Sequence, residues 1–255
     1  MEGELEVYYF SGTGNTKFIV EYIVSRLSDR KINVETYNIE DGFKKIKKEK
    51  AKMFVFPINS QATCPFIWKH LKRLPEGNGE KIFTIITLNE SSAIEKSLYK
   101  LLKKKGYNPV YYNEISMPNN MINGVIDIEN EKIRVKKALE KCDVILDDII
   151  SEKSKWISEF KGSKMVSFLS RNTSIPWFFM RLIFKLEVNK KACVNCGLCE
   201  KQCPVGNINL DNKSKHSKKC EFCMRCISSC PNKAIYIKGK ENYIIKKMVY
   251  EGDDK

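Results

Sequence analysis

The chain has 255 residues, long enough for one sizeable domain and a smaller one, and its formal net charge is +14. Residues 1–150 carry 24 Lys and Arg against 21 Asp and Glu, whereas residues 151–255 carry 21 against 10. No stretch of about 18 uncharged apolar residues occurs, and the acidic start Met1–Glu4 differs from a basic export signal, so we expect no membrane-spanning helix. No nucleic-acid-binding motif accompanies the basic surplus, so we expect an acidic protein as the partner and no nucleic acid.

The first 37 residues predict the beginning of an α/β fold. Residues 5–10 form an apolar run typical of a buried strand, and the short segment 11–16 contains glycine and hydroxyl residues. Apolar residues then recur at helical spacing over 18–27, and residues 33–37 alternate as a second strand. A strand, a glycine-hydroxyl loop and a helix therefore form a compact first unit.

The next fifty residues continue this alternation. The charge run 44–50 is interpreted as a solvated helix face. The apolar runs 53–58 and 82–88 are typical of strands that are buried on both faces of a sheet. Apolar residues at helical spacing between these runs predict a helix that begins near Pro65.

The remaining elements complete a five-stranded pattern. Residues 91–105 predict an amphipathic helix that Gly106 ends, residues 110–115 a fifth strand, and residues 135–149 a long final helix. Strands that alternate with helices pack as a parallel sheet covered on both faces. The fold class predicted for residues 1–150 is therefore α/β, a doubly wound five-stranded parallel sheet.

Residues 151–184 are predicted to be a helical linker to a second domain over 185–240, which a tail at 241–255 follows. The segment 174–184 is conspicuously apolar. We interpret it as a helix packed between the domains, with a membrane-surface helix as the alternative.

Two cysteine runs with the same spacing dominate the second domain. Each has the form C-x2-C-x2-C-x3-C followed by proline, the spacing that holds 4Fe–4S clusters in bacterial ferredoxins, where the fourth cysteine serves the other cluster. We assign to one cluster Cys193, Cys196, Cys199 and Cys230, and to the other Cys220, Cys223, Cys226 and Cys203. Zinc and disulfides are the alternatives, although zinc sites usually pair two C-x2-C units across a longer gap. Cysteines kept reduced for cluster binding predict a cytoplasmic location.

The hexad Ser11–Thr16 lies where doubly wound folds bind phosphates, after the first strand and before the first helix. Gly12 and Gly14 let the backbone turn and expose N–H groups, and the neighbouring hydroxyls add further donors. The hexad lacks the patterns of a P-loop and of a dinucleotide-binding loop. The prediction is a flavin phosphate site, and the alternative is a plain turn that caps the helix.

Phe10 followed by Ser-Gly-Thr-Gly-Asn-Thr resembles the FMN phosphate loop of flavodoxins, which has the form Ser/Thr-x-Thr-Gly-Asn-Thr. With its two cysteine runs, the whole chain resembles the flavodoxin–ferredoxin fusions of anaerobic bacteria and archaea, sometimes called ferrodoxins. The flavodoxin-like part covers about residues 1–150 and the ferredoxin-like part about 185–240. The resemblance implies a small α+β domain with two 4Fe–4S clusters.

The resemblance also implies non-covalently bound FMN, with ring contacts from the loops after the third and fourth strands. Those loops, 57–64 and 87–92, lack the aromatic and glycine residues typical of the family. The cofactor-binding residues predicted on this basis are Ser11, Gly12, Thr13, Gly14, Asn15, Thr16, Pro57, Asn59, Ser60, Thr87, Leu88, Asn89 and Glu90.

The function expected from these features is electron transfer among two 4Fe–4S clusters, FMN and a redox partner. No catalytic acid or base is assigned, and the oligomeric state is left open. The alternatives are a flavin-dependent reductase of a small organic acceptor and a redox-sensing or docking protein whose flavodoxin-like domain is empty.

Overall fold

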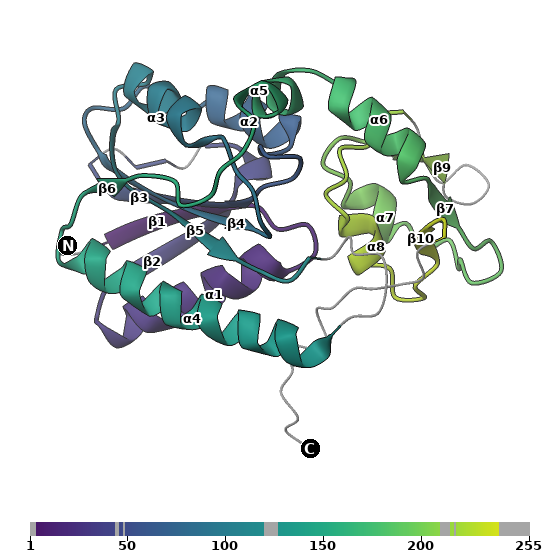
Figure 1. Cartoon of the computed structure of the whole chain (residues 1–255), viewed down its shortest axis with the longest axis horizontal. Helices are drawn as coiled ribbons and strands as arrows, with labels where there is room; N and C mark the ends of the chain where they lie inside the picture. The colour runs from purple at the N-terminus through teal and green to yellow at the C-terminus, as the bar shows by residue number, and fades with distance from the viewer. Residues whose placement is uncertain are drawn as a thin grey trace.

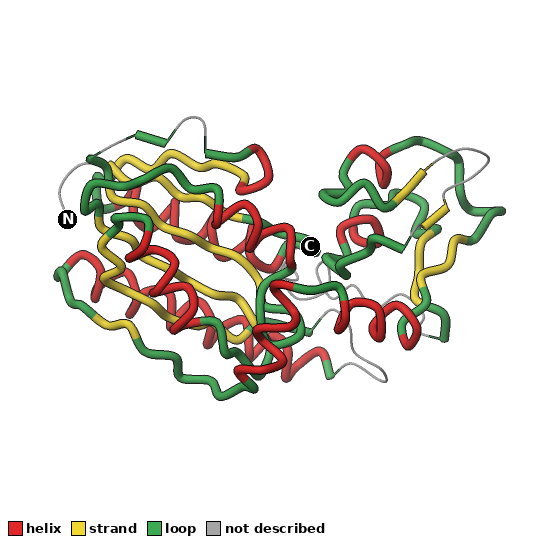
Figure 2. Tube along the Cα trace, turned by 90° about the horizontal axis from the view of Figure 1, so that it is seen from above, coloured by secondary structure: helices red, strands yellow, loops and turns green. Residues whose placement is uncertain are grey.

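The computed structural model describes residues 4–43, 46–47, 49–119, 127–209, 215–216 and 218–239. A parallel sheet lies between two layers of helices, and a smaller unit of short helices and strand pairs lies beside it (Figure 1). Figure 2 shows the two units side by side, with the long strands confined to one of them. The strands of the sheet are β1 (Glu4–Tyr9), β2 (Asn33–Asn38), β3 (Ala51–Pro57), β4 (Lys81–Leu88), β5 (Asn108–Ser116) and β6 (Lys155–Trp156).

The strand order is β2-β1-β3-β4-β5-β6, and each neighbouring pair is parallel. The first five strands follow the flavodoxin-like order of doubly wound folds, which confirms the predicted fold class. The sheet has one strand more than the five predicted, because β6 pairs Lys155 and Trp156 with β5. A two-residue strand is too short to show alternation in the sequence, so periodicity gave no signal for it.

Helices cover both faces of the sheet (Figure 1). Figure 1 shows α1 (Asn15–Asp29) and α4 (Ile128–Ile150) on one face, and α2 (Pro65–Lys72), α3 (Glu95–Lys104) and α5 (Lys164–Asn172) on the other. The apolar stripes found in the sequence, such as Ile19, Ile23 and Leu27 of α1, are fully buried against the strands. Helix packing therefore follows the periodicity of the sequence on both faces.

The charge run 44–50 is not a helix in its described residues, 46, 47, 49 and 50. The backbone N–H of Lys47 donates to the buried carboxylate of Glu6, and its ammonium lies 2.7 Å from Glu35. The prediction of a helix face was wrong because Lys47 and Lys50 pair with carboxylates of β1 and β2, which hold these residues against the sheet in an irregular conformation.

The segment predicted as a linker is largely part of the sheet domain, which we define as β1–β6 with α1–α5. Glu114 of β5 is fully buried, and its carboxylate accepts hydrogen bonds from the backbone of Glu159 and Phe160. These bonds hold the chain after β6 against the sheet. Only α6 (Ile175–Ile183), which follows α5 after two residues, leads into the second unit.

The second unit, which we call the cluster module, comprises residues 185–239 as far as they are described. Strands β7 (Leu186–Val188) and β10 (Ile235–Ile237) form one antiparallel pair, and β8 (Ile208–Asn209) and β9 (Lys215–His216) form another. The module also contains two single-turn helices, α7 (Leu198–Lys201) and α8 (Arg225–Ser228). The tail predicted at 241–255 lies outside the described residues. In the part of the chain that the structure describes, no helix is long and apolar enough to cross a membrane.

Candidate functional site

The two cysteine runs adopt the same local backbone. In the first run Asn195 and Gly197 have φ angles of 57° and 80°, and in the second run Phe222 and Met224 at the matching positions have 50° and 63°. Each run then continues into one helical turn, α7 or α8. In each run the two left-handed residues, which lie two positions apart, turn the chain so that the first three cysteines of the run face a common centre.

The structure brings the eight cysteines of the two runs together as two groups that cross between the runs. Cys193, Cys196 and Cys199 line one cavity together with Cys230 of the second run. In the other group, burial and, to a smaller extent, the nearby Cys203 of the first run raise the pKa values of Cys220, Cys223 and Cys226. All ten cysteines of the chain are free thiols. The crossed assignment of the eight cysteines to two cubane clusters stays a prediction.

Backbone amides and burial set the chemistry of these thiols. The N–H groups of Asn207 and Ala234 donate to the sulfurs of Cys203 and Cys230 at 3.2 and 3.3 Å. Burial raises the pKa of Cys220 to about 11 and that of Cys223 to about 12. Burial therefore disfavours the thiolate forms of Cys220 and Cys223, and a metal that binds them has to displace their protons. Amide donors to the sulfurs stabilise the thiolate and tune the potential of a bound cluster.

The hexad Ser11–Thr16 begins at the carboxyl end of β1 and opens α1, as predicted. Gly14 has a φ of 111°, which favours glycine, and its N–H donates to the hydroxyl of Ser11 at 3.1 Å. The side chains of the hexad also bind the neighbouring strand ends: Thr16 shares a 2.7 Å hydrogen bond with Thr87 near the end of β4, and Asn15 donates to the carbonyl of Pro118 after β5. The hexad is thus fixed where three parallel strands end.

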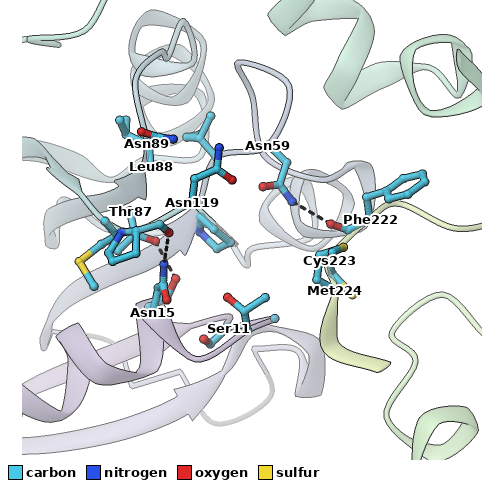
Figure 3. Close-up of a pocket in the computed structure, with 17 residues that line it drawn as sticks. Ser11, Asn15, Asn59, Thr87, Leu88, Asn89, Asn119, Phe222, Cys223 and Met224 are labelled. Carbon is cyan, nitrogen blue, oxygen red and sulfur yellow. Dashed lines mark hydrogen bonds between the residues drawn. The ribbon is translucent and has the colours of Figure 1, made fainter. Parts of the chain in front are cut away.

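A cavity of about 100 Å³ opens beside the hexad (Figure 3). Ten of the thirteen residues predicted to bind the flavin line it: Ser11, Gly12, Thr13, Asn15, Thr16, Pro57, Asn59, Thr87, Leu88 and Asn89. Gly14, Ser60 and Glu90 do not line it. Ser60 instead accepts a 3.0 Å hydrogen bond from the hydroxyl of Ser170 in α5, and Glu90 is exposed.

Sequence reasoning missed the other walls of this cavity. One comes from the chain after β5, namely Met117, Pro118 and Asn119. The other comes from the second cysteine run, whose residues Phe222, Cys223 and Met224 face the hexad across the cavity (Figure 3). The five-strand pattern was a signal for the first wall, because a loop after β5 ends at the same sheet edge. The sequence contained no signal for the second wall.

The cluster module is in direct contact with the flavodoxin-like loops. The Cα of Gly12 lies so close to the carbonyl oxygen of Cys223 that a Cβ added at this glycine would collide with it. Asn59, in the loop after β3, donates to the carbonyl of Phe222 at 3.2 Å, and the buried thiol of Cys64 donates to that of Glu221 at 3.3 Å. The second cysteine run is therefore held by both loops at the end of the sheet.

Arg225 makes the strongest polar link between the two units. Its guanidinium pairs with Glu40 at 2.7 and 2.8 Å, donates to the carbonyl of Ser11 at 3.1 Å and lies 4.5 Å from the ring centroid of Phe10. Both charged side chains are mostly shielded, with 15% and 25% of their surface exposed. Nearby, Ser228 donates to the carbonyl of Gly12 at 2.9 Å. One charged pair thus anchors the second run to the sheet domain beside the hexad.

We expect Glu40→Gln to lower the free energy of unfolding by about 1–2 kcal/mol, because it leaves the shielded guanidinium of Arg225 without its charged partner. Chemical denaturation of the anaerobic protein measures the change. Glu35→Gln is the matched control, since it removes an exposed pair with Lys47 that contributes at most about 0.5 kcal/mol. Equal losses in the two variants would contradict the anchoring role.

The two runs differ in what they place at their left-handed positions. The first run has Asn195 and Gly197, and the second has Phe222 and Met224, which are 1% and 8% exposed. A left-handed backbone costs a bulky residue about 1–2 kcal/mol. The second run offsets this cost because both side chains pack into the hydrophobic core shared with the sheet domain. Phe222 and Met224 thus add apolar contacts with the sheet domain that Asn195 and Gly197 do not supply.

The hexad fits a phosphate better than the cavity fits a whole flavin. The loop offers amide and hydroxyl groups at the amino end of a 15-residue helix, the arrangement that binds a phosphate monoester. The space of about 100 Å³ is well below the roughly 300–1,000 Å³ of cofactor-sized pockets. Phe222, Cys223 and Met224 form one of its walls.

Comparison with known proteins identifies the domain type of the cluster module. Residues 185–231 match the family model of the 4Fe–4S dicluster domain. An uncharacterized ferredoxin of Methanocaldococcus jannaschii is 33% identical over 61 residues, 21% of this chain and 39% of that protein. A polyferredoxin of Methanothermus fervidus is 40% identical over 53 residues, 20% of this chain and 12% of that protein. The chain thus spans well under half the length of these curated relatives.

Solved structures resemble the other part of the chain. A Fusobacterium nucleatum flavodoxin bound to flavin mononucleotide is 22% identical, with a TM-score of 0.42, over 60% of this chain and all of that one. An archaeal flavodoxin is 17% identical, with a TM-score of 0.39, over 58% of this chain and 97% of that one. The strand order, and not these scores, identifies the fold of the sheet domain. The chain therefore joins a flavodoxin-like domain to a 4Fe–4S dicluster domain, the arrangement of a flavodoxin–ferredoxin fusion.

Proposed function

We propose that this protein is an electron-transfer protein that passes electrons one at a time through two 4Fe–4S clusters between a redox partner and its flavodoxin-like domain. The observation that carries the proposal is the grouping of eight free cysteines into two crossed sets of four. The contact between Cys223 and Gly12 supports a short path from one cluster to the phosphate loop.

The position of the two sets supports an order of transfer. The set that contains Cys223 abuts the sheet domain, whereas the set that contains Cys196 is at the surface, where Cys196 is exposed and Val194 is 63% exposed. Lys190 and Lys191 are exposed just before this set. We propose that an acidic redox partner docks here, because complementary charge speeds encounter between transient partners.

FMN is the third centre that we propose. The hydroxyls and amides of the hexad supply the phosphate site, and when bound the flavin supplies an exchange between one-electron and two-electron chemistry. The hexad holds and orients the phosphate end, and residues 222–224 exclude water from the pocket on the cluster side. Widening of the cavity at residues 222–224 is a requirement of this proposal.

A second function is favoured by the small volume of that cavity. In it, the flavodoxin-like domain carries no flavin and serves as a docking scaffold for the cluster module. Flavin released on denaturation of anaerobically reconstituted protein separates the two: about one FMN for each chain supports the first function, and none, with both clusters intact, supports the second. The small volume of the pocket gives no support to a reductase that binds a small organic acceptor beside a flavin.

Thr13→Glu tests the phosphate site directly. We expect it to weaken FMN binding at least about 100-fold, because a carboxylate in the loop repels the phosphate and occupies its space. Titration of the flavin-free protein with FMN, followed by fluorescence, measures the change. Ser25→Glu adds the same charge on the exposed face of α1, and we expect it to leave the affinity within about twofold. Equal FMN affinity in Thr13→Glu and the unaltered protein would show that the hexad is only a helix cap.

A further inference from the structure

Helices α5 and α6 leave a large apolar surface unpartnered. Five of the nine residues of α6 are large, apolar and at least half exposed: Ile175, Phe178, Phe179, Leu182 and Ile183. They recur at i, i+3, i+4, i+7 and i+8, which is one face of a helix. Helix α5, which packs against α6, adds Met165 at 69% and Phe168 at 54% exposure. We call these seven residues the α5–α6 face.

The opposite side of α6 is already buried against the protein. Trp177 is 1% exposed and donates to the carbonyl of Ser170, and Arg181 donates to the carbonyl of Cys220 at 2.8 Å. The interdomain packing predicted for this helix therefore accounts for its inner side only. A helix that is apolar all round is normally covered on every side. We therefore expect another molecule to cover the outer side of α6.

Charge in the surrounding sequence identifies the kind of occupant. Residues 160–186 contain five Lys and Arg and no Asp or Glu, and Glu159 and Glu187 flank this segment. Arg171 and Arg181 point inward, whereas Lys161, Lys164 and Lys185 are exposed near the ends of the two helices, with Lys185 3.9 Å from the carboxylate of Glu187. Phenylalanine and leucine on one face, with an excess of lysine around them, is the composition of helices that lie on anionic membranes.

The length of α6 fits a helix that lies flat on a membrane surface. Figure 1 shows α6 along the edge of the cluster module, with α5 next to its amino end. Nine helical residues extend about 14 Å, less than half of the roughly 30 Å of a hydrocarbon core. Such a helix lies in the interface and does not span the bilayer.

We propose that the α5–α6 face docks this protein on an anionic lipid bilayer. Phe178, Phe179, Leu182 and Ile183 enter the boundary between headgroups and acyl chains, and the three lysines face the lipid phosphates. Because α6 contacts Cys220 through Arg181, docking holds the cluster module next to the membrane surface. This places the protein within reach of electron carriers that reside in the bilayer.

Vesicle co-sedimentation of the anaerobic, cluster-loaded protein tests the proposal. We expect binding to phosphatidylglycerol-containing vesicles that salt weakens, and little binding to pure phosphatidylcholine. The double variant Phe179→Ser/Leu182→Ser should lose about tenfold in binding for each side chain. Lys161→Gln, Lys164→Gln and Lys185→Gln together should lose about fivefold for each lysine on anionic vesicles only.

The control is Ile133→Ser/Val144→Ser, which removes two side chains on α4 that are 50% and 60% exposed. It should bind vesicles as the unaltered protein does, and an unchanged cluster absorbance in every variant shows that the fold is kept. Failure of the unaltered protein to bind anionic vesicles overturns the proposal. So does a dimer in lipid-free sedimentation velocity that Phe179→Ser/Leu182→Ser abolishes, because a second copy would then cover the face. Both readouts are independent of whether FMN binds.

Discussion

The double variant Cys203→Ser/Cys220→Ser is expected to keep one cluster, whereas Cys199→Ser/Cys203→Ser is expected to lose both. In the crossed arrangement Cys203 and Cys220 serve the same cluster, so their joint loss spares the set of Cys193, Cys196, Cys199 and Cys230. Cys199 and Cys203 serve different clusters although they belong to the same run. Iron analysis after anaerobic reconstitution should give about four irons for the first variant and about none for the second.

Two reference proteins are measured alongside for their iron content. We expect about eight irons in the unaltered protein and about four in the single variant Cys203→Ser. The free cysteine Cys142, buried in α4, provides the control, because Cys142→Ser leaves both sets of ligands intact. If each run instead held its own cluster, the two double variants would exchange their outcomes. That reversal would refute the crossed assignment while leaving the two-cluster function in place.

Gly12→Ala should separate the two halves of the molecule. The added methyl group meets the backbone carbonyl of Cys223, which has no freedom to rotate away as a side chain would. Overpacking of this kind costs about 2–3 kcal/mol, and here the cluster module relieves it by moving off the phosphate loop. We expect a lower free energy of unfolding, and a loss of protection from proteolysis in the loops that hold Asn59 and Phe222.

Gly79→Ala is the control for this variant. Gly79 has a φ of 85° and no atom near the position of an added Cβ, so it tests backbone strain without a collision. We expect it to cost about 1 kcal/mol and to leave the proteolysis pattern between the two units unchanged. Equal proteolysis of the Gly12 and Gly79 variants would show that the contact with Cys223 does not hold the units together.

The sequence was sufficient for the architecture of the sheet domain because its signals are local. The continuous apolar run 53–58 predicts a strand buried on both faces, and it became β3 in the middle of the sheet. The apolar stripe of the last helix, including Cys142, was likewise buried in α4. Where a residue's environment is set by the period of its own element, the pattern predicts it.

The remaining features depend on contacts between distant segments. The second wall of the cavity comes from Phe222 and Met224, which are 210 or so residues away from the hexad and carry no pattern that links them to it. Cys64 showed no basic or histidine neighbour in the sequence, yet it contacts the second cysteine run through Glu221. The extent of the α5–α6 face was hidden as well, because an apolar run does not tell which of its sides will be covered.

The first cysteine run has Gly197 where the second run has Met224, so the two runs make different contacts. If the segments 193–203 and 220–230 exchanged places, all eight cysteines would keep their spacing, but Gly197 would offer no side chain to the hydrophobic core that Met224 shares with the sheet domain. The cluster module would then lose part of the packing that orients it, so the two cysteine runs are not interchangeable.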